Sequence, residues 1–227
     1  MSSDLEKKFL ELLRKPVKSK HEVQEMEEIG EKFKEELNNE TRELLNQLKA
    51  AGLNVTSVWD LVNTKSSYPE AIDILLNHLR KKYHHKNKEG IIRALAVKEA
   101  KGKATSLLID EYYKTPKDEK SLRWAIGNTI FTIITQQDLD KILPIVQDKD
   151  NGESRQMFVA SLGKIKSDRA EDTLIELLDD NEVAAQSLYA LGLLKSKKAK
   201  EKIILMKNHP NPLIRKEANE SAKKIGS

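Results

Sequence analysis

The stretch SRQMFVASLG at residues 154–163 decides the fold. After Arg155, apolar and small side chains recur three or four residues apart until Leu162 and Gly163. This spacing places the apolar side chains on one side of an α-helix, and no strand-like alternation competes with it. The stretch therefore predicts a short amphipathic helix.

Four other segments follow the same pattern. The second positions of the five segments are residues 93, 123, 155, 184 and 215, which gives steps of 30, 32, 29 and 31 residues. Between these segments lie helical patterns at residues 68–79, 104–113, 138–147, 169–178 and 199–206. A period of this size is typical of stacked helical repeats. We therefore predict an all-α fold with about five antiparallel helix pairs over residues 68–227.

These segments resemble the HEAT repeat in its short bacterial HEAT-like form. Residues 154–163 are similar to the second helix of that family, which starts with Val-Arg and ends with Ala-Leu-Gly. Residues 183–192 have the same ending but carry Ala184 in place of Arg, and residues 142–148 are similar to the first helix, with its proline and its terminal Asp. The resemblance implies a right-handed α-solenoid whose second helices line a concave wall. It implies a fold and carries little information about chemistry.

Residues 1–67 are less regular and predict a separate, acidic N-terminal helical cap. Between His21 and Leu45 we count nine acidic and three basic residues. A solenoid needs a polar cap over its first repeat, so we interpret this segment as a solvated capping helix pair, with a docking surface as the alternative.

Composition narrows the class of protein. The chain has no cysteine, which excludes disulfides, thiolate metal sites and cysteine nucleophiles and favours a cytoplasmic protein. No run approaches the ~20 apolar residues that a membrane helix needs, so we expect no membrane contact. The net charge of +4 is too small to predict a polyanionic partner by itself.

Helical periodicity also predicts a binding surface. Numbered from the residue before the Arg, positions three, seven and ten of each second helix fall opposite the core stripe. The candidate partner-binding residues on this face are Trp124, Asn128, Phe131, Gln156 and Tyr189. For Trp124 and Phe131, burial in the core is an equal alternative, because residues 122–134 are apolar on nearly every side.

Two groups of basic residues have competing interpretations. We expect the recurrent Arg93, Arg123, Arg155 and Arg215 to tie neighbouring repeats together through acidic turns. Alternatively, they form a ladder that follows nucleic-acid phosphates. A second basic group is the best candidate for contacts with a polyanion, and it comprises Lys195, Lys197, Lys198 and Lys200.

Sequence signals for catalysis are weak, and we predict no catalytic residues, no cofactor and no metal site. His78, His84 and His85 lie close together, but no nearby carboxylate recurs at a ligand spacing. Some HEAT-like proteins are alkylpurine DNA glycosylases that use an Asp on the concave wall, and no Asp occupies positions three, seven or ten here.

We therefore expect a binding module rather than an enzyme: a scaffold, adaptor or inhibitor that grips a protein partner on its concave face. One alternative is nucleic-acid binding or a HEAT-like DNA glycosylase. A second is a HEAT-like lyase or chaperone that acts on a cofactor-bearing protein.

Overall fold

A computed structural model describes residues 4–226 of the protein. These residues form 14 α-helices and no strand, and 73% of them are helical, far above the third that is usual in globular proteins. The helices pack as neighbouring pairs, so the predicted all-α repeat architecture is confirmed. The chain divides into two compact units between Ala94 and Leu95.

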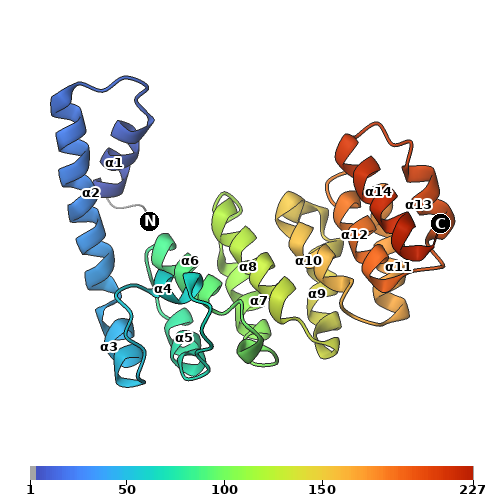
Figure 1. Ribbon diagram of the computed structural model, residues 1–227, viewed down its shortest axis with the longest axis horizontal. Coiled ribbons are helices and arrows are strands. Elements are labelled where there is room, and N and C mark those ends of the chain that lie inside the picture. The colour runs from blue at the N-terminus through green and yellow to red at the C-terminus, as the bar shows by residue number, and fades with distance from the viewer. Residues whose placement is uncertain (1–3, 227) are drawn as a thin grey trace. The chain divides into compact units, whose positions relative to one another are not determined.

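The N-terminal unit contains six helices (Figure 1). They are α1 (Asp4–Arg14), α2 (Lys20–Glu40), α3 (Arg42–Ala50), α4 (Val58–Asn63), α5 (Ala71–Leu79) and α6 (His85–Ala94). Because α5 packs on α3 and α6 packs on α4, the first predicted repeat belongs to this unit. The segment predicted as the N-terminal cap and the first predicted repeat thus lie in the same compact unit.

Helix α2 starts at a capping box. The Ser19 hydroxyl accepts a hydrogen bond from the Glu22 backbone N–H, and the Glu22 carboxylate accepts one from the Ser19 backbone N–H. Hydrogen bonding, first from Lys15 and then from Ser19, lowers the pKa of Glu22 to about 2. Helix α1 then packs along α2, where the Phe9 ring lies against Gly30.

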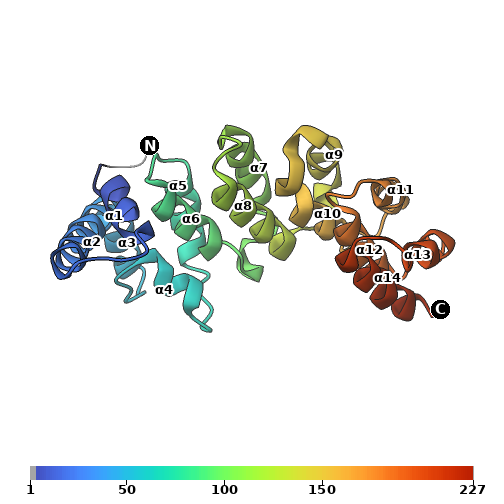
Figure 2. The same ribbon diagram turned by 90° about the horizontal axis from the view of Figure 1, so that it is seen from above.

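The C-terminal unit contains four helix pairs. The first helices of the pairs are α7 (Thr105–Lys114), α9 (Leu139–Gln147), α11 (Asp168–Glu176) and α13 (Lys200–Met206). The second helices are α8 (Lys120–Ile133), α10 (Gln156–Leu162), α12 (Ala184–Leu194) and α14 (Pro212–Ile225). Within this unit, Figures 1 and 2 show the second helices side by side in the order α8, α10, α12, α14.

The predicted start of the second helix in the first repeat was wrong. The segment from Ile92 was predicted to begin a second helix, but α6 ends at Ala94. A short 3₁₀ turn at Lys98–Ala100 follows, and α7 begins only at Thr105. The Arg-containing pattern misled here because Arg93 lies in the last turn of α6, where its side chain reaches back to Glu89.

Small residues set how closely the second helices approach. A Cβ atom added at Gly163 would lie 2.7 Å from the Ala190 Cα and 2.8 Å from its carbonyl oxygen. A Cβ added at Gly192 would lie 2.7 Å from the Ser221 hydroxyl. Both glycines were expected on the face opposite the core, but both are buried. The reason is that successive second helices pack directly on each other, so position ten faces the next repeat.

We expect Gly163→Ala to destabilise the protein by ~1–3 kcal/mol, because backbone atoms of α12 would have to move. The matched control is Gly30→Ala, where the new methyl group would meet only the Phe9 ring. That side chain can shift, and alanine favours helix by up to ~1 kcal/mol over glycine. Urea unfolding of both variants measures the difference. An equal loss of stability in the two would contradict the close-contact assignment.

Candidate functional site on the second helices

Three consecutive second helices of the C-terminal unit contain no acidic residue. Helices α8, α10 and α12 lack both Asp and Glu. The first helices beside them carry several carboxylates, including Asp110 and Glu111 in α7 and Asp168, Glu171 and Asp172 in α11. Acidic charge in these repeats thus lies on the first helices and in the turns, and the three second helices themselves carry no carboxylate.

Aromatic side chains of this surface are partly exposed. Trp124 in α8 is 46% exposed, which answers the question left open by the sequence: its side chain is not core. Phe131 and Tyr189 are half-buried, and their ring centroids lie 6.3 Å apart although α10 lies between α8 and α12. Ala160 and Gly163 of the α10 segment are small, and Gly163 lies directly against Ala190, the neighbour of Tyr189. The structure therefore brings Phe131 and Tyr189 together as a pair.

Two lysines accompany the aromatic pair. The Lys164 ammonium lies 3.7 Å from the centroid of the Phe131 ring and donates a hydrogen bond of 2.5 Å to the Phe131 carbonyl oxygen. The Lys224 ammonium lies 5.2 Å from the centroid of the Tyr189 ring. Desolvation, followed by repulsion from Lys101, lowers the pKa of Lys164. Neither lysine was singled out by the sequence pattern, although Lys164 directly follows the Gly163 that ends the repeat motif.

The two amide side chains predicted for this surface have different environments. The Asn128 Nδ2 atom is buried and has no hydrogen-bond partner among the described residues. The Gln156 amide instead donates to the Glu182 carbonyl oxygen at 2.8 Å, and therefore joins α10 to the turn before α12. Asn128 thus has a buried donor without a partner among the described residues, whereas Gln156 uses its amide within the repeat array.

Arg155 joins two repeats. Its side chain is fully buried and donates to Asp180 at 2.6 Å and to Glu182 at 3.1 Å, both in the turn before α12. It also donates to the carbonyl oxygens of Val146 and Gly152 in its own repeat. The guanidinium group thus satisfies acceptors from two repeats at once.

Arg123 acts in a similar way one repeat earlier. Its guanidinium carbon lies 3.9 Å from the centroid of the Tyr112 ring, and one of its N–H groups donates to the Asn151 side chain at 2.8 Å. Arg123 is 4% exposed and Arg155 is 0% exposed. Side chains buried to this degree cannot follow a row of phosphates, so these two arginines do not form the ladder considered as the alternative.

The other two recurrent arginines make local contacts. Arg93 pairs with Glu89 one turn earlier in α6. Arg215 donates to the carbonyl oxygens of His209 and Pro210, just before α14. The bonds seen for Arg93 and Arg215 thus lie within their own repeats, whereas Arg123 and Arg155 reach the following one.

The basic group around residue 195 is partly neutralised. Lys198 pairs with Asp172, and this hydrogen bond raises the pKa of Lys198. Lys195, Lys197 and Lys200 are exposed. Lys195 also ends α12 in a left-handed conformation with φ of 53°. The group is a surface cluster at the junction of α12 and α13, away from the exposed Trp124 of α8.

The candidate histidines have a partner that lies far away in the sequence. His84 and His85 both contact Glu6 of α1, while the His78 ring is hydrogen-bonded to Gln47 and Tyr83. No metal site was predicted because no carboxylate recurred nearby. The carboxylate instead comes from 78 residues earlier, a separation that no local spacing rule detects.

The fold and these repeat-to-repeat contacts define a helical-repeat protein. The family model of the PBS lyase HEAT-like repeat matches residues 154–180, which run from the turn before α10 through α11. The protein therefore carries HEAT-like repeats, as its sequence predicted. A comparison with curated proteins found no match. Among the described helices, none is long and apolar enough to cross a membrane.

We expect Arg155→Met to destabilise the protein by ~3–5 kcal/mol, because it leaves Asp180 without its buried partner. Arg215→Met is the matched control and removes only local hydrogen bonds of ~1 kcal/mol in sum. Chemical denaturation followed by circular dichroism compares the two variants. Similar losses would show that Arg155 has no special role between the repeats.

Stability should also fall in acid because of Asp180. Burial alone would raise the pKa of this carboxyl group, but hydrogen bonds from Arg155 and from the Glu182 backbone N–H outweigh it and lower the pKa. A carboxyl group whose pKa is lower in the folded state than in the unfolded state stabilises the fold at pH values above its unfolded-state pKa of about 4. This stabilisation is lost as the pH falls from there through the folded-state pKa. The urea concentration at the unfolding midpoint should therefore decrease when the pH is lowered below about 4. Asp180→Asn should flatten this dependence, and an unchanged slope would contradict the assignment.

Proposed function

We propose that the protein is a partner-binding repeat module whose docking surface is formed by α8, α10 and α12. The observation that carries the proposal is the absence of carboxylates from these three helices, together with the exposed Trp124. Exposed aromatic residues are enriched at the centres of protein interfaces, where they supply much of the binding energy. Catalysis is not part of the proposal.

The charge pattern favours an acidic protein partner. Lys101, Lys164 and Lys224 lie at or near the aromatic pair, and no Asp or Glu of α8, α10 or α12 opposes them. A partner segment that combines apolar side chains with carboxylates would match both features. Its apolar groups would pack on Trp124, Phe131 and Tyr189, and its carboxylates would face the lysines.

Nucleic acid is the second candidate, and two observations weigh against it. The buried Arg123 and Arg155 cannot contact phosphates. Besides Lys101, Lys164 and Lys224 near the aromatic pair, helices α8, α10 and α12 contain only Lys120 and the buried Arg123 as basic residues, so a nucleic-acid backbone would meet few further charges along this surface. The match to the PBS lyase HEAT-like repeat does not support a lyase activity, because the family model covers a single repeat of this chain and describes a fold.

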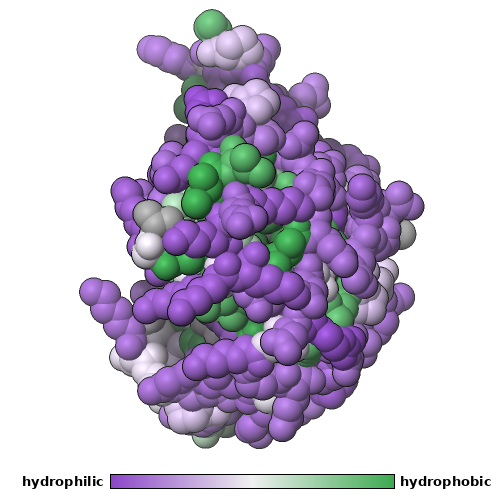
Figure 3. Space-filling view, turned by 90° about the vertical axis from the view of Figure 1, so that its right-hand side faces the viewer, coloured by the Kyte–Doolittle hydropathy of each residue, from purple (hydrophilic) through white to green (hydrophobic). Residues whose placement is uncertain are grey.

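The exposed apolar residues near the end of the C-terminal unit are a less suitable surface. Leu205 is 74% exposed and Leu213 is 53% exposed. In the face shown in Figure 3, however, hydrophobic side chains form small patches that rows of hydrophilic ones separate. Scattered apolar side chains of this kind are normal on protein surfaces. The aromatic surface with its lysines is therefore preferred.

A matched pair of tyrosine variants tests the surface. Once a partner has been isolated by affinity capture in the presence of nuclease, we expect Tyr189→Ala to weaken its binding by about tenfold or more, because buried Tyr anchors are typical hot spots. Tyr113→Ala is the control, since Tyr113 is 57% exposed but lies in the first helix α7. Isothermal titration calorimetry measures both affinities.

The outcomes separate the two candidates. Circular dichroism must first show that the Tyr189→Ala protein remains folded. Equal affinities of the Tyr189→Ala and Tyr113→Ala proteins would exclude the second-helix surface. Capture that disappears after nuclease treatment, with affinity falling steeply as salt rises, would instead support nucleic-acid binding.

A further inference from the structure

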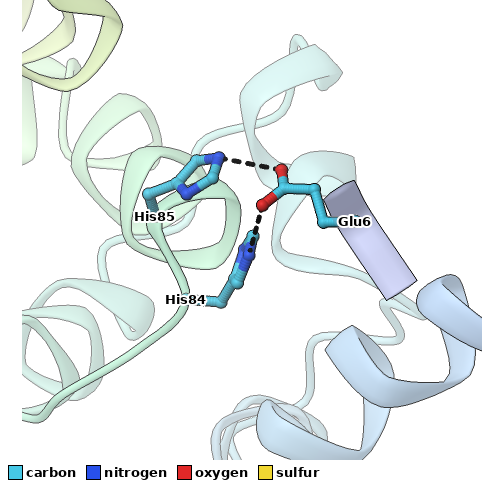
Figure 4. Close-up of side chains that lie close together, drawn as sticks. All are labelled: Glu6, His84 and His85. Carbon is cyan, nitrogen blue, oxygen red and sulfur yellow. Dashed lines mark hydrogen bonds and ion pairs between the residues drawn. The ribbon is translucent and has the colours of Figure 1, made fainter. Parts of the chain in front are cut away.

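A carboxylate and two imidazoles meet inside the N-terminal unit. The Glu6 carboxylate oxygens lie 3.1 Å from the His84 Nε2 atom and 3.1 Å from the His85 Nε2 atom (Figure 4). Glu6 comes from α1, whereas His84 precedes α6 and His85 begins it. All three potential ligand atoms lie within 4.8 Å of one another.

The Glu6 carboxylate is almost completely buried, and such a group needs cationic partners. Its side chain is 2% exposed, while the side chains of His84 and His85 are 9% and 30% exposed. Moving a carboxylate out of water costs several kcal/mol of hydration free energy, and nearby positive charge must compensate this cost. Lys86 is one flexible cation in contact, and its ammonium lies 3.7 Å from Glu6 in a side chain that is 39% exposed. A divalent cation bound at Glu6 would supply the same compensation.

The spacing of the three ligand atoms fits a transition-metal ion. Two atoms that bind Zn²⁺ at ~2.1 Å with an angle of about 100° between them lie about 3.2 Å apart. The two contacts between Glu6 and the histidines are each 3.1 Å long and join a different carboxylate oxygen to each imidazole, so each oxygen lies at ligand spacing from one histidine. Two imidazoles with one carboxylate are a ligand set used by Zn²⁺ and other divalent first-row metals. The partial exposure of His85 leaves room for water as a further ligand.

We propose that Glu6, His84 and His85 form a binding site for a divalent transition-metal ion of the Zn²⁺ type. In the metal-free protein the His84 Nδ1 atom accepts the Lys86 backbone N–H at 3.3 Å, so Nε2 carries the proton and donates it to Glu6. Binding moves this proton to Nδ1, frees Nε2 for the metal and gives up the long contact from Lys86. Lys86 must also swing away, because its ammonium and the metal compete for the same carboxylate.

The bound ion would fasten α1 to the start of α6. Glu6 and His84 are 78 residues apart in the chain, so a metal that binds both closes a long loop. A ligand that binds only the folded state stabilises it in proportion to the logarithm of its concentration. The ion is thus assigned a structural role within the N-terminal unit, separate from the docking surface on α8, α10 and α12.

The test uses the full-length protein after removal of metals with a chelator. Isothermal titration calorimetry with Zn²⁺ should show one ion per chain, and Zn²⁺ should slow amide exchange in residues 4–14. Glu6→Gln and His85→Asn should each weaken Zn²⁺ binding by at least about tenfold, since even outer-shell changes at metal sites cost 10–100-fold. His209→Asn is the matched control, because His209 lies in the other unit, and it should leave the affinity unchanged.

Lys86→Met separates a metal site from a purely electrostatic cluster. If the site binds metal, removing the competing ammonium should increase the affinity for Zn²⁺. If the cluster only balances charge, Lys86→Met should lower the melting temperature, and added Zn²⁺ should not restore it. Absence of Zn²⁺ binding, or binding that Glu6→Gln and His85→Asn leave intact, would overturn the proposal. Circular dichroism of the metal-free variants checks that each one is folded.

Discussion

The arrangement of the C-terminal unit depends on the close approach of neighbouring second helices. This approach is possible because Gly163 and Gly192 present no side chain to the next helix. With larger residues there, the repeats would lie further apart. A wider gap between α10 and α12 at Gly163 would also lengthen the distance from the Arg155 guanidinium to Asp180 and from the Phe131 ring to the Tyr189 ring. The bond between these two repeats and the aromatic pair therefore both depend on the close approach of α10 and α12.

Much of the fold could be predicted from the sequence because helical repeats encode it locally. The five first-helix patterns match α5, α7, α9, α11 and α13 to within three residues at each end. The phase error in the first repeat has a simple cause: Arg at position 93 matches the motif, yet the helix that contains it has nearly finished. A one-dimensional pattern does not distinguish an Arg that starts a helix from one that ends it.

The candidate sites were less accessible to sequence reasoning. Periodicity identified Trp124 and Tyr189 because it assigns residues to helix faces. It could not identify Lys164, which lies just beyond α10 and reaches the Phe131 ring through space. It also could not pair Glu6 with His84 and His85, since that contact depends on how α1 packs in the N-terminal unit. Contacts between distant segments require the tertiary fold, and a local pattern contains no information about them.

The replacement of Arg by Ala184 in one repeat has a consequence for cooperativity. In a repeat array, coupling between neighbours determines whether the units unfold together or one by one. The junctions that follow Arg123 and Arg155 are held by polar bonds. Across the next junction the structure shows apolar packing, a bond of 2.6 Å from the Ser221 hydroxyl to the Leu188 carbonyl oxygen, and the ion pairs of Lys198 with Asp172 and of Lys202 with Asp179. These two ion pairs are partly exposed to solvent and contribute little to stability, whereas the Arg155 side chain that pairs with Asp180 is fully buried. Acid would therefore weaken the junction at Arg155 more than the junction between the last two helix pairs.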